Sequence, residues 1–376
     1  MCPGDVQNDR QPARRYAAFG SYVDRVDAAL DGWYARLGAW PGSVILALLV
    51  LVAAFFHIDG GLSPLAHGAD YAALSLDPFD PERPNGLRLR ILGPLIGWLL
   101  HLRGPLFVVV PWIFLVGVLA VVNSWCRRVG CGSTLALAVI LALAFSPTCL
   151  HSLAAPGFID PVTYFFVALA LMHVRHVAVS CASMALAVCA HESAAFLIPA
   201  WLLAAGSRVV WSRLGSQRIL LLLLMLLPYF GYRWWMAQLD PTVLTTAFYL
   251  SSQNLIACIA VGPLATAFGI FGTFRLHWLV LALCALLVGR KGRSLQWALL
   301  LILLVALTLL FAYDTTRMFC WTFPVLGAQE LAHRVGRHRA VALFLIAWML
   351  NFLIPPYTTT GAETYKLRTI RNYVTQ

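Results

Sequence analysis

The sequence predicts an all-α fold: a polytopic transmembrane helical bundle of about 10–12 segments, some of them short or re-entrant. Hydrophobic residues make up 60% of the 376 positions and charged residues only 11%, whereas a soluble domain carries about 25% charged residues. The apolar residues also come in blocks close to the length of about 20 residues that crosses a hydrocarbon core. Because lipid offers the backbone no hydrogen-bond partner, the crossing segments are expected to be helical.

The N-terminal segment, residues 1–40, is expected on the cytoplasmic side as a polar stretch followed by an amphipathic helix. Apolar side chains recur there at helical spacing, with Asp24, Arg25, Asp31 and Arg36 between them. The apolar positions are Phe19, Val23, Val26, Leu30, Trp33, Leu37 and Trp40. This pattern is typical of a helix that lies in the membrane interface, with its tryptophans at headgroup level.

The transmembrane bundle is expected over residues 41–356, and a polar tail over 357–376. The first span covers about residues 43–57, and a polar loop at 59–90 follows it. Further apolar blocks lie near 91–102, 105–124, 133–150, 158–174, 177–190, 192–206, 218–235, 255–273, 276–289, 295–312, 318–332 and 340–355. The blocks at 91–102 and 177–190 are too short to cross alone, which indicates short, tilted or re-entrant helices. The block at 177–190 is expected to pair with 192–206 as a hairpin or a re-entrant segment.

The net charge of +11 comes from basic clusters between the apolar blocks, at 127–128, 173–176, 208–218, 290–293 and 334–339. Lys and Arg in short loops mark the cytoplasmic side of a membrane protein. We therefore expect a multi-pass membrane protein with a cytoplasmic N-terminus, and no nucleic-acid partner. The loop 59–90 and the turns near 151–160, 191–192, 236–253 and 313–317 then face outward.

Ionisable residues collect on this outer face, where they are expensive near the hydrocarbon and usually line a polar cavity. They are Asp70, Arg88, Arg90, Asp160, His191, Glu192, Asp314 and Arg317. Simpler roles remain open for some of them. Asp160 precedes Pro161 and could cap a helix, and Asp314 could pair with Arg317 three residues later. His191 and Glu192 begin no zinc motif, because position 195 is Ala.

Arg88 and Arg90, in LRLRILGPL, stand at the edge of an apolar segment. Guanidinium groups match phosphate oxygens with a fork of donors, so this pair suits a lipid phosphate or diphosphate. Walker A, Rossmann and G-x-S-x-G patterns do not occur in the sequence. Nucleotide-driven chemistry within the chain is therefore not indicated.

Several segments together carry a family resemblance: the loop with Asp70, RLRILGPL, GFIDPVTYFFVALAL, AHESAAFLIPAWLL and YDTTRMFCWTFPVL. Over about residues 40–330 the chain resembles bacterial multi-pass proteins of the GT-C class of membrane glycosyltransferases. The resemblance implies transfer of a sugar from a polyprenyl-phosphate-linked donor to an acceptor at the outer face of the inner membrane.

By position, the resemblance assigns to Asp70 the role of general base or of a group that helps bind metal. It assigns the donor phosphate to Arg88 or Arg90, and we add Arg317 as a further phosphate contact. Asp160, His191, Glu192 and Asp314 are expected to line the cavity. No metal site follows from the spacing, the sequence indicates no particular cofactor, and a divalent cation remains possible. The expected partners are the lipid-linked donor and membrane lipids, with the acceptor open.

Other classes of function remain open. A transporter or lipid flippase would place polar residues through the midplane and have two related halves, whereas here the charges cluster at one face. A polysaccharide polymerase or acyltransferase would also use an outer-facing cavity, and a purely structural subunit of a membrane complex would need none of these groups.

Overall fold

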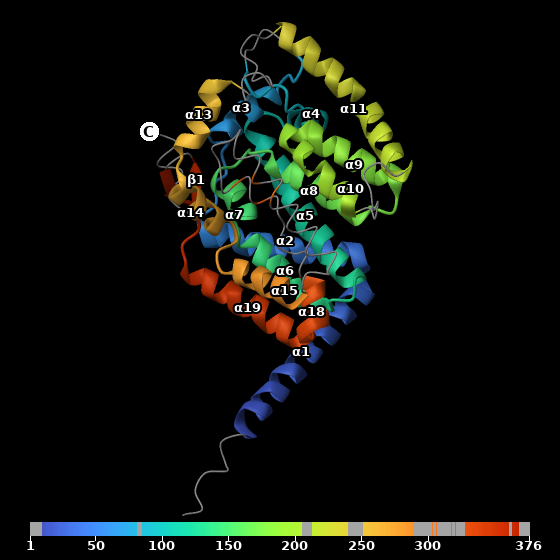
Figure 1. The fold of residues 1–376 in the computed structure, drawn as a ribbon, viewed down its shortest axis with the longest axis vertical. Coiled ribbons are helices and arrows are strands. Elements are labelled where there is room, and N and C mark those ends of the chain that lie inside the picture. Colours follow the sequence, from blue (N-terminus) through green and yellow to red (C-terminus); the bar gives the residue numbers. More distant parts are fainter. Residues whose placement is uncertain are drawn as a thin grey trace, which may run out of the picture.

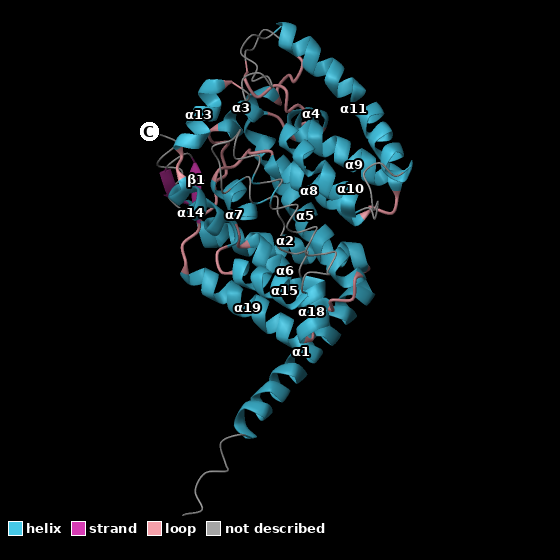
Figure 2. Ribbon diagram, viewed as in Figure 1, coloured by secondary structure: helices cyan, strands magenta, loops and turns pink. Residues whose placement is uncertain are grey.

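The computed structural model describes residues 10–80, 85–204, 213–239, 251–288, 328–360 and 363–367, together with Leu303, Ala306, Arg317 and Cys320. Within these residues the helices are joined by loops and turns, and the strands form one small hairpin (Figure 2), which confirms the predicted all-α bundle. Most of the apolar blocks at 295–312 and 318–332 lies outside the described residues, as does Asp314.

Helix α1 (Arg10–Leu37) extends from one end of the bundle (Figure 1) and turns into α2 (Ala39–Ile58) at Gly38. Gly38 has a φ of 86°, a conformation that favours glycine. The amphipathic helix is where the sequence predicts it, but part of its apolar face packs on protein. Val23 and Tyr34 are buried, whereas Tyr22 is exposed.

Ion pairs fasten α1 to the start of α19 (Arg337–Leu353). Arg337 pairs with Asp24, and its Nη1 lies 2.8 Å from Asp27 Oδ2. The hydrogen bond to His338, at 2.9 Å, lowers the pKa of the Asp24 carboxyl. The basic cluster at 334–339 therefore lies beside the acidic residues of α1.

The loop after α2 holds two short helices, α3 (His67–Leu74) and α4 (Leu92–Leu99). The chain then returns through the short 3-10 helix η1 (Gly104–Val108) and the long helix α5 (Val109–Arg128). Helix α4 accounts for the apolar block at 91–102, which the sequence identifies as too short to cross alone.

The apolar block at 133–150 forms two helices, α6 (Ser133–Ala144) and α7 (Pro147–Ala154), with a bend of 46° between them. The break falls at Ser146, which is extended because a residue before proline is pushed out of the helical region. All residues of α7 are buried. Helix α7 is therefore a short internal helix with polar side chains such as Thr148 and His151.

Helices α8 (Asp160–Met172) and α9 (Val177–Ala190) pack against each other, and the 3-10 helix η2 (Glu192–Leu197) leads into α10 (Ile198–Ala204). The sequence predicts this hairpin of 177–190 with 192–206, and the turn falls at His191 and Glu192. Helix α11 (Arg213–Leu239) then runs along the edge of the bundle (Figure 1).

The last apolar blocks are also interrupted. Helices α13 (Ser252–Ala260) and α14 (Pro263–Phe274) meet at 77°, where Gly262 has a φ of 81° and Pro263 starts the second helix. Helix α15 (His277–Val288) follows, and α18 (Ala328–Val335) precedes α19. The predicted polar tail forms an antiparallel hairpin of β1 (Tyr357–Thr360) and β2 (Glu363–Lys366).

The bundle has two chemically different ends. At the α1 end, the Arg127 guanidinium lies 3.4 Å from the centre of the Tyr34 ring, and Ser133 Oγ donates to Asp31. At the α3 end, the loop after α2 meets the end of α7, where Gly61 N donates to Leu153 O at 2.8 Å. Helices α2, α5, α8 and α9 connect the two ends.

By length and composition, three of the described helices can cross a membrane: α2, η1 with α5, and residues 215–239 of α11. The count rises to five if each bent pair, α6–α7 and α13–α14, is one span. Helices α8, α9 and η2–α10 are apolar but shorter. The chain is therefore a membrane protein with several transmembrane helices, and the described part has fewer full-length spans than the blocks predict.

Candidate functional site

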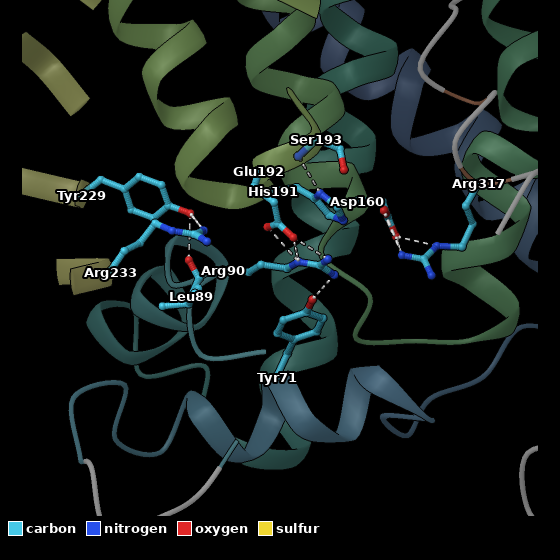
Figure 3. A network of polar contacts seen from close by, with 10 residues as sticks. All are labelled: Tyr71, Leu89, Arg90, Asp160, His191, Glu192, Ser193, Tyr229, Arg233 and Arg317. Atoms are coloured by element: carbon cyan, nitrogen blue, oxygen red, sulfur yellow. Dashed lines mark hydrogen bonds and ion pairs between the residues drawn. The ribbon is translucent and has the colours of Figure 1, made fainter. Parts of the chain in front are cut away.

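A network of charged and aromatic side chains occupies the α3 end (Figure 3). Its members come from segments far apart in the sequence: α3, the turn before α4, the start of α8, the α9–η2 turn, the outer part of α11, and Arg317. Two guanidinium–carboxylate pairs form its centre.

The first pair joins Arg90 to Glu192. Arg90 Nη2 donates to Glu192 Oε1 at 2.8 Å, and Arg90 Nε lies 3.1 Å from Oε2. The third nitrogen, Nη1, donates to the hydroxyl of Tyr71 at 3.2 Å. The side chains remain 12% and 28% exposed, so this pair is the more accessible of the two. Its fork geometry is the one that guanidinium also offers to phosphate.

The second pair joins Arg317 to Asp160. The distance from Arg317 Nη2 to Asp160 Oδ2 is 3.0 Å, and Arg317 Nε donates to the same oxygen at 3.2 Å. Both side chains are buried. The sequence leaves open whether Asp314 pairs with Arg317, and Asp314 lies outside the described residues. The carboxylate that the structure shows beside Arg317 is that of Asp160, at the start of α8. Asp160 therefore neutralises the buried guanidinium of Arg317. A buried cation needs such a partner more strongly than α8 needs an N-terminal cap.

Phe158 connects the second pair to two histidines. The Arg317 guanidinium lies 4.7 Å from its ring centre, as in a cation–π contact. The ring of His151 packs edge-on at 5.0 Å and that of His67 at 5.9 Å. Phe158 thus lies between the buried pair and the exposed surface of α3.

Asp70 lies on α3, next to Tyr71, and is exposed. Its Oδ2 lies 3.2 Å from His67 Nδ1, one helical turn earlier, and the two side chains are 51% and 56% exposed. The backbone oxygen of Asp70 accepts a hydrogen bond from Asn85 at 3.1 Å. A carboxylate that faces solvent beside an imidazole is chemically able to accept a proton.

Tyr71 and His191 are held differently. Burial raises the pKa of Tyr71 to about 12, so its hydroxyl stays protonated beside Arg90. His191 Nδ1 accepts a hydrogen bond from Ser193 N at 3.2 Å, which caps the start of η2. Because Nδ1 is an acceptor in that bond, the ring proton of a neutral His191 lies on Nε2.

Arg88 is the most deeply buried of the predicted phosphate ligands. Its Nη1 donates to the backbone oxygen of Asp80, and its own backbone oxygen accepts from the hydroxyl of Tyr232 at 3.1 Å. These contacts hold the turn before α4 against α11. The phosphate-binding assignment of Arg88 stays a prediction, and its burial makes it the least accessible candidate.

The structure thus gathers Arg90, Asp160, His191, Glu192 and Arg317 in one network and places Asp70 at its edge. Sequence reasoning missed four participants: His67, Tyr71, Tyr229 and Arg233. Of these, His67 had a signal, since it precedes Asp70 by three residues on a helical segment.

Metal binding has no support in the described part of the chain, where no group of three or more His, Cys, Asp or Glu side chains is placed to hold an ion. The carboxylates of Asp160 and Glu192 instead face guanidinium groups.

Comparison with protein-family models, with curated proteins and with solved structures finds no match for this chain.

Proposed function

We propose that this membrane protein is a glycosyltransferase that moves a sugar from a polyprenyl-phosphate-linked donor to an acceptor, and that the reaction takes place at the α3 end. The observation that carries the proposal is the meeting of an exposed carboxylate, Asp70, with a network that holds Arg90 and Arg317. The resemblance to the GT-C class, drawn from the sequence, supports the same reaction.

Sugar transfer needs both kinds of group. The acceptor hydroxyl oxygen attacks the anomeric carbon, its proton passes to a base, and the bond from that carbon to the phosphate oxygen breaks. The departing lipid phosphate gains one negative charge, which nearby guanidinium groups stabilise. We assign the base to Asp70, with His67 orienting the carboxylate or relaying the proton.

Among the predicted phosphate ligands, Arg90 suits the role best, because it is partly exposed and its fork faces a carboxylate that a phosphate can replace. The Asp160–Arg317 pair is buried, so we assign it to holding α8 and residues 158–160 in place. Tyr71 connects the proposed base to the proposed phosphate ligand, since it follows Asp70 in α3 and its hydroxyl contacts Arg90.

Transport is the main competing function. It requires charged groups that face a path through the bundle. The buried guanidinium of Arg275, at the α14–α15 junction, instead donates to the backbone oxygens of Phe145, Asn351 and Ile354. Those contacts suit a structural role. The described ion pairs lie at the two ends of the bundle and not along a path through its middle, which favours an enzyme.

A transfer assay in membranes tests the proposal. Membranes with the wild-type chain receive either a radiolabelled polyprenyl-phosphate sugar or the corresponding nucleotide sugar. The proposal expects transfer from the lipid-linked donor only, and loss of that transfer in Asp70→Asn and Arg90→Ala at equal membrane insertion. Transfer from the nucleotide sugar alone, or from no donor, would reject it.

A further inference from the structure

The arginines at the α3 end differ in how fully the protein satisfies them. Arg90 and Arg317 each face a carboxylate. Arg88 is buried and donates to a backbone oxygen, and Arg103 donates twice to the backbone oxygen of Trp98. Arg233, on α11, has neither arrangement within the part of the chain that the structure describes.

Arg233 is held by a single aromatic residue. Its Nη1 donates to the hydroxyl of Tyr229 at 2.9 Å, and its guanidinium lies 5.5 Å from the centre of the same ring. No carboxylate among the described residues lies within ion-pair distance of it. A half-buried guanidinium of this kind keeps most of its five donors for another partner.

Tyr229 places Arg233 beside the network. The Tyr229 hydroxyl donates to the backbone oxygen of Leu89 at 3.0 Å, and Leu89 directly precedes Arg90. Figure 3 shows Arg233 and Tyr229 on the side of Arg90 and Glu192 that faces away from Arg317. The two guanidinium groups therefore flank the same short turn.

The surroundings of Arg233 are those of a membrane interface. Trp234 and Trp235 follow it, and the Trp234 side chain is 71% exposed. Leu220, Leu223, Leu224 and Leu227, on the preceding turns of α11, are also exposed. Leucines followed by tryptophans along a spanning helix are typical of a lipid-facing surface that ends at headgroup level. A lipid that lies along α11 would bring its phosphate to Arg233.

We propose that Arg233 binds the phosphate of the lipid-linked donor at the outer part of α11, next to Arg90. The identity of that lipid rests on the proposed function. The phosphate site rests on the lipid-facing helix and on a guanidinium that contacts no carboxylate in the described part of the chain. The local charge agrees with an anionic ligand. Among the residues drawn in Figure 3, the pairs Arg90–Glu192 and Asp160–Arg317 are each neutral, and Arg233 adds one positive charge.

Binding to the purified chain in nanodiscs tests this site without any transfer reaction. The probes are a polyprenyl phosphate without sugar, a polyprenol of the same length, and phosphatidylglycerol. Wild type is expected to prefer the polyprenyl phosphate over the polyprenol by about tenfold or more, since a hydrogen bond to a charged group contributes that much. Arg233→Gln is expected to remove most of this preference and Arg233→Lys to retain part of it.

Arg175→Gln is the matched control, because it removes the same charge from an exposed position at the opposite end of the bundle. The inference is overturned if Arg233→Gln binds like wild type, if Arg175→Gln loses as much, or if phosphatidylglycerol competes equally with the polyprenyl phosphate. The last result would mean that Arg233 only contacts bulk lipid.

The two proposals fail separately. A phosphate preference that Arg233→Gln abolishes, in a chain that transfers no sugar from any donor, would keep this site and reject the glycosyltransferase. Sugar transfer by wild type, with phosphate binding unchanged in Arg233→Gln, would keep the enzyme and reject this site.

Discussion

Arg90 and Glu192 lie 102 positions apart in the chain and form a bidentate ion pair with distances of 2.8 to 3.2 Å. The pair joins the turn before α4 to the α9–η2 turn. It also turns Arg90 toward Tyr71, the neighbour of Asp70. The pair is thus the link between the first loop and the rest of the α3 end.

Removal of Glu192 alone should lower the free energy of unfolding more than removal of both Glu192 and Arg90. Glu192→Leu leaves Arg90 largely buried without a counter-ion, and we expect a loss of about 3–5 kcal/mol in the free energy of unfolding. The double variant Arg90→Met, Glu192→Leu should recover most of it. Thermal unfolding in detergent measures the difference.

His67→Ala serves as the control, because exposed pairs contribute at most about 1 kcal/mol. Equal melting of the single and double variants would show that the pair is not coupled.

Close backbone approach is expected to decide the position of α3. A Cβ added at Gly68 would lie 2.1 Å from Pro156 O and 3.0 Å from Gly157 Cα. Gly68→Ala should therefore displace α3 and reduce both stability and any transfer activity. In Gly32→Ala a Cβ would meet nothing within 4 Å, so that variant should be neutral or slightly stabilising.

Limited proteolysis of the loop at 59–91 compares the two glycine variants. Equal cleavage of Gly68→Ala and Gly32→Ala would contradict the predicted displacement.

Arg275 is expected to be a structural residue that lysine cannot replace. Its guanidinium donates to Phe145 O, at the end of α6, and to Asn351 O and Ile354 O, at the end of α19. A lysine ammonium is a compact group and lacks the planar fork that reaches these oxygens together. We expect Arg275→Lys and Arg275→Met to lower the melting temperature similarly, and full stability of Arg275→Lys would refute this role.

The pH dependence of Tyr71 follows from its burial, which raises the pKa to about 12 from an ordinary value of 10.0. The folded chain disfavours the ionised form. The stability that the protonated Tyr71 hydroxyl contributes is therefore complete below pH 10.0 and is lost as pH rises toward 12.

The test is the tyrosinate absorbance of wild type minus that of Tyr71→Phe, measured as pH rises. The difference, which reports the Tyr71 hydroxyl, should appear only above the ordinary pKa of tyrosine and together with unfolding. A difference spectrum that titrates near pH 10.0 would contradict this account.

The sequence predicted the class of fold and the positions of the short elements, because hydrophobic blocks and proline or glycine breaks are local signals. Helix α4 and the hairpin of α9 with α10 show this. It also predicted that Asp160, His191 and Glu192 belong together, since membrane sidedness alone places them at one end. It did not predict the partners within that set.

Arg317 shows why partners escape prediction. Spacing offered Asp314, which lies outside the described residues, whereas the carboxylate that the structure shows beside Arg317 belongs to Asp160, 157 positions away in the chain. Pairings of this kind depend on how helices pack, which a single sequence does not encode locally. The hairpin at residues 357–366 was missed as well, because it follows a long series of helices in a segment that appeared only polar.

The measurement that most directly tests the central claim compares two carboxylates of the same loop. Asp70 and Asp77 are both exposed, but only Asp70 lies beside the network; Asp77 accepts a hydrogen bond from Phe79 N. Sugar transfer from a polyprenyl-phosphate donor is measured in membranes with equal amounts of wild type, Asp70→Asn and Asp77→Asn. The account predicts loss of transfer in Asp70→Asn and normal transfer in Asp77→Asn. Normal transfer in Asp70→Asn, or equal loss in both, would contradict it.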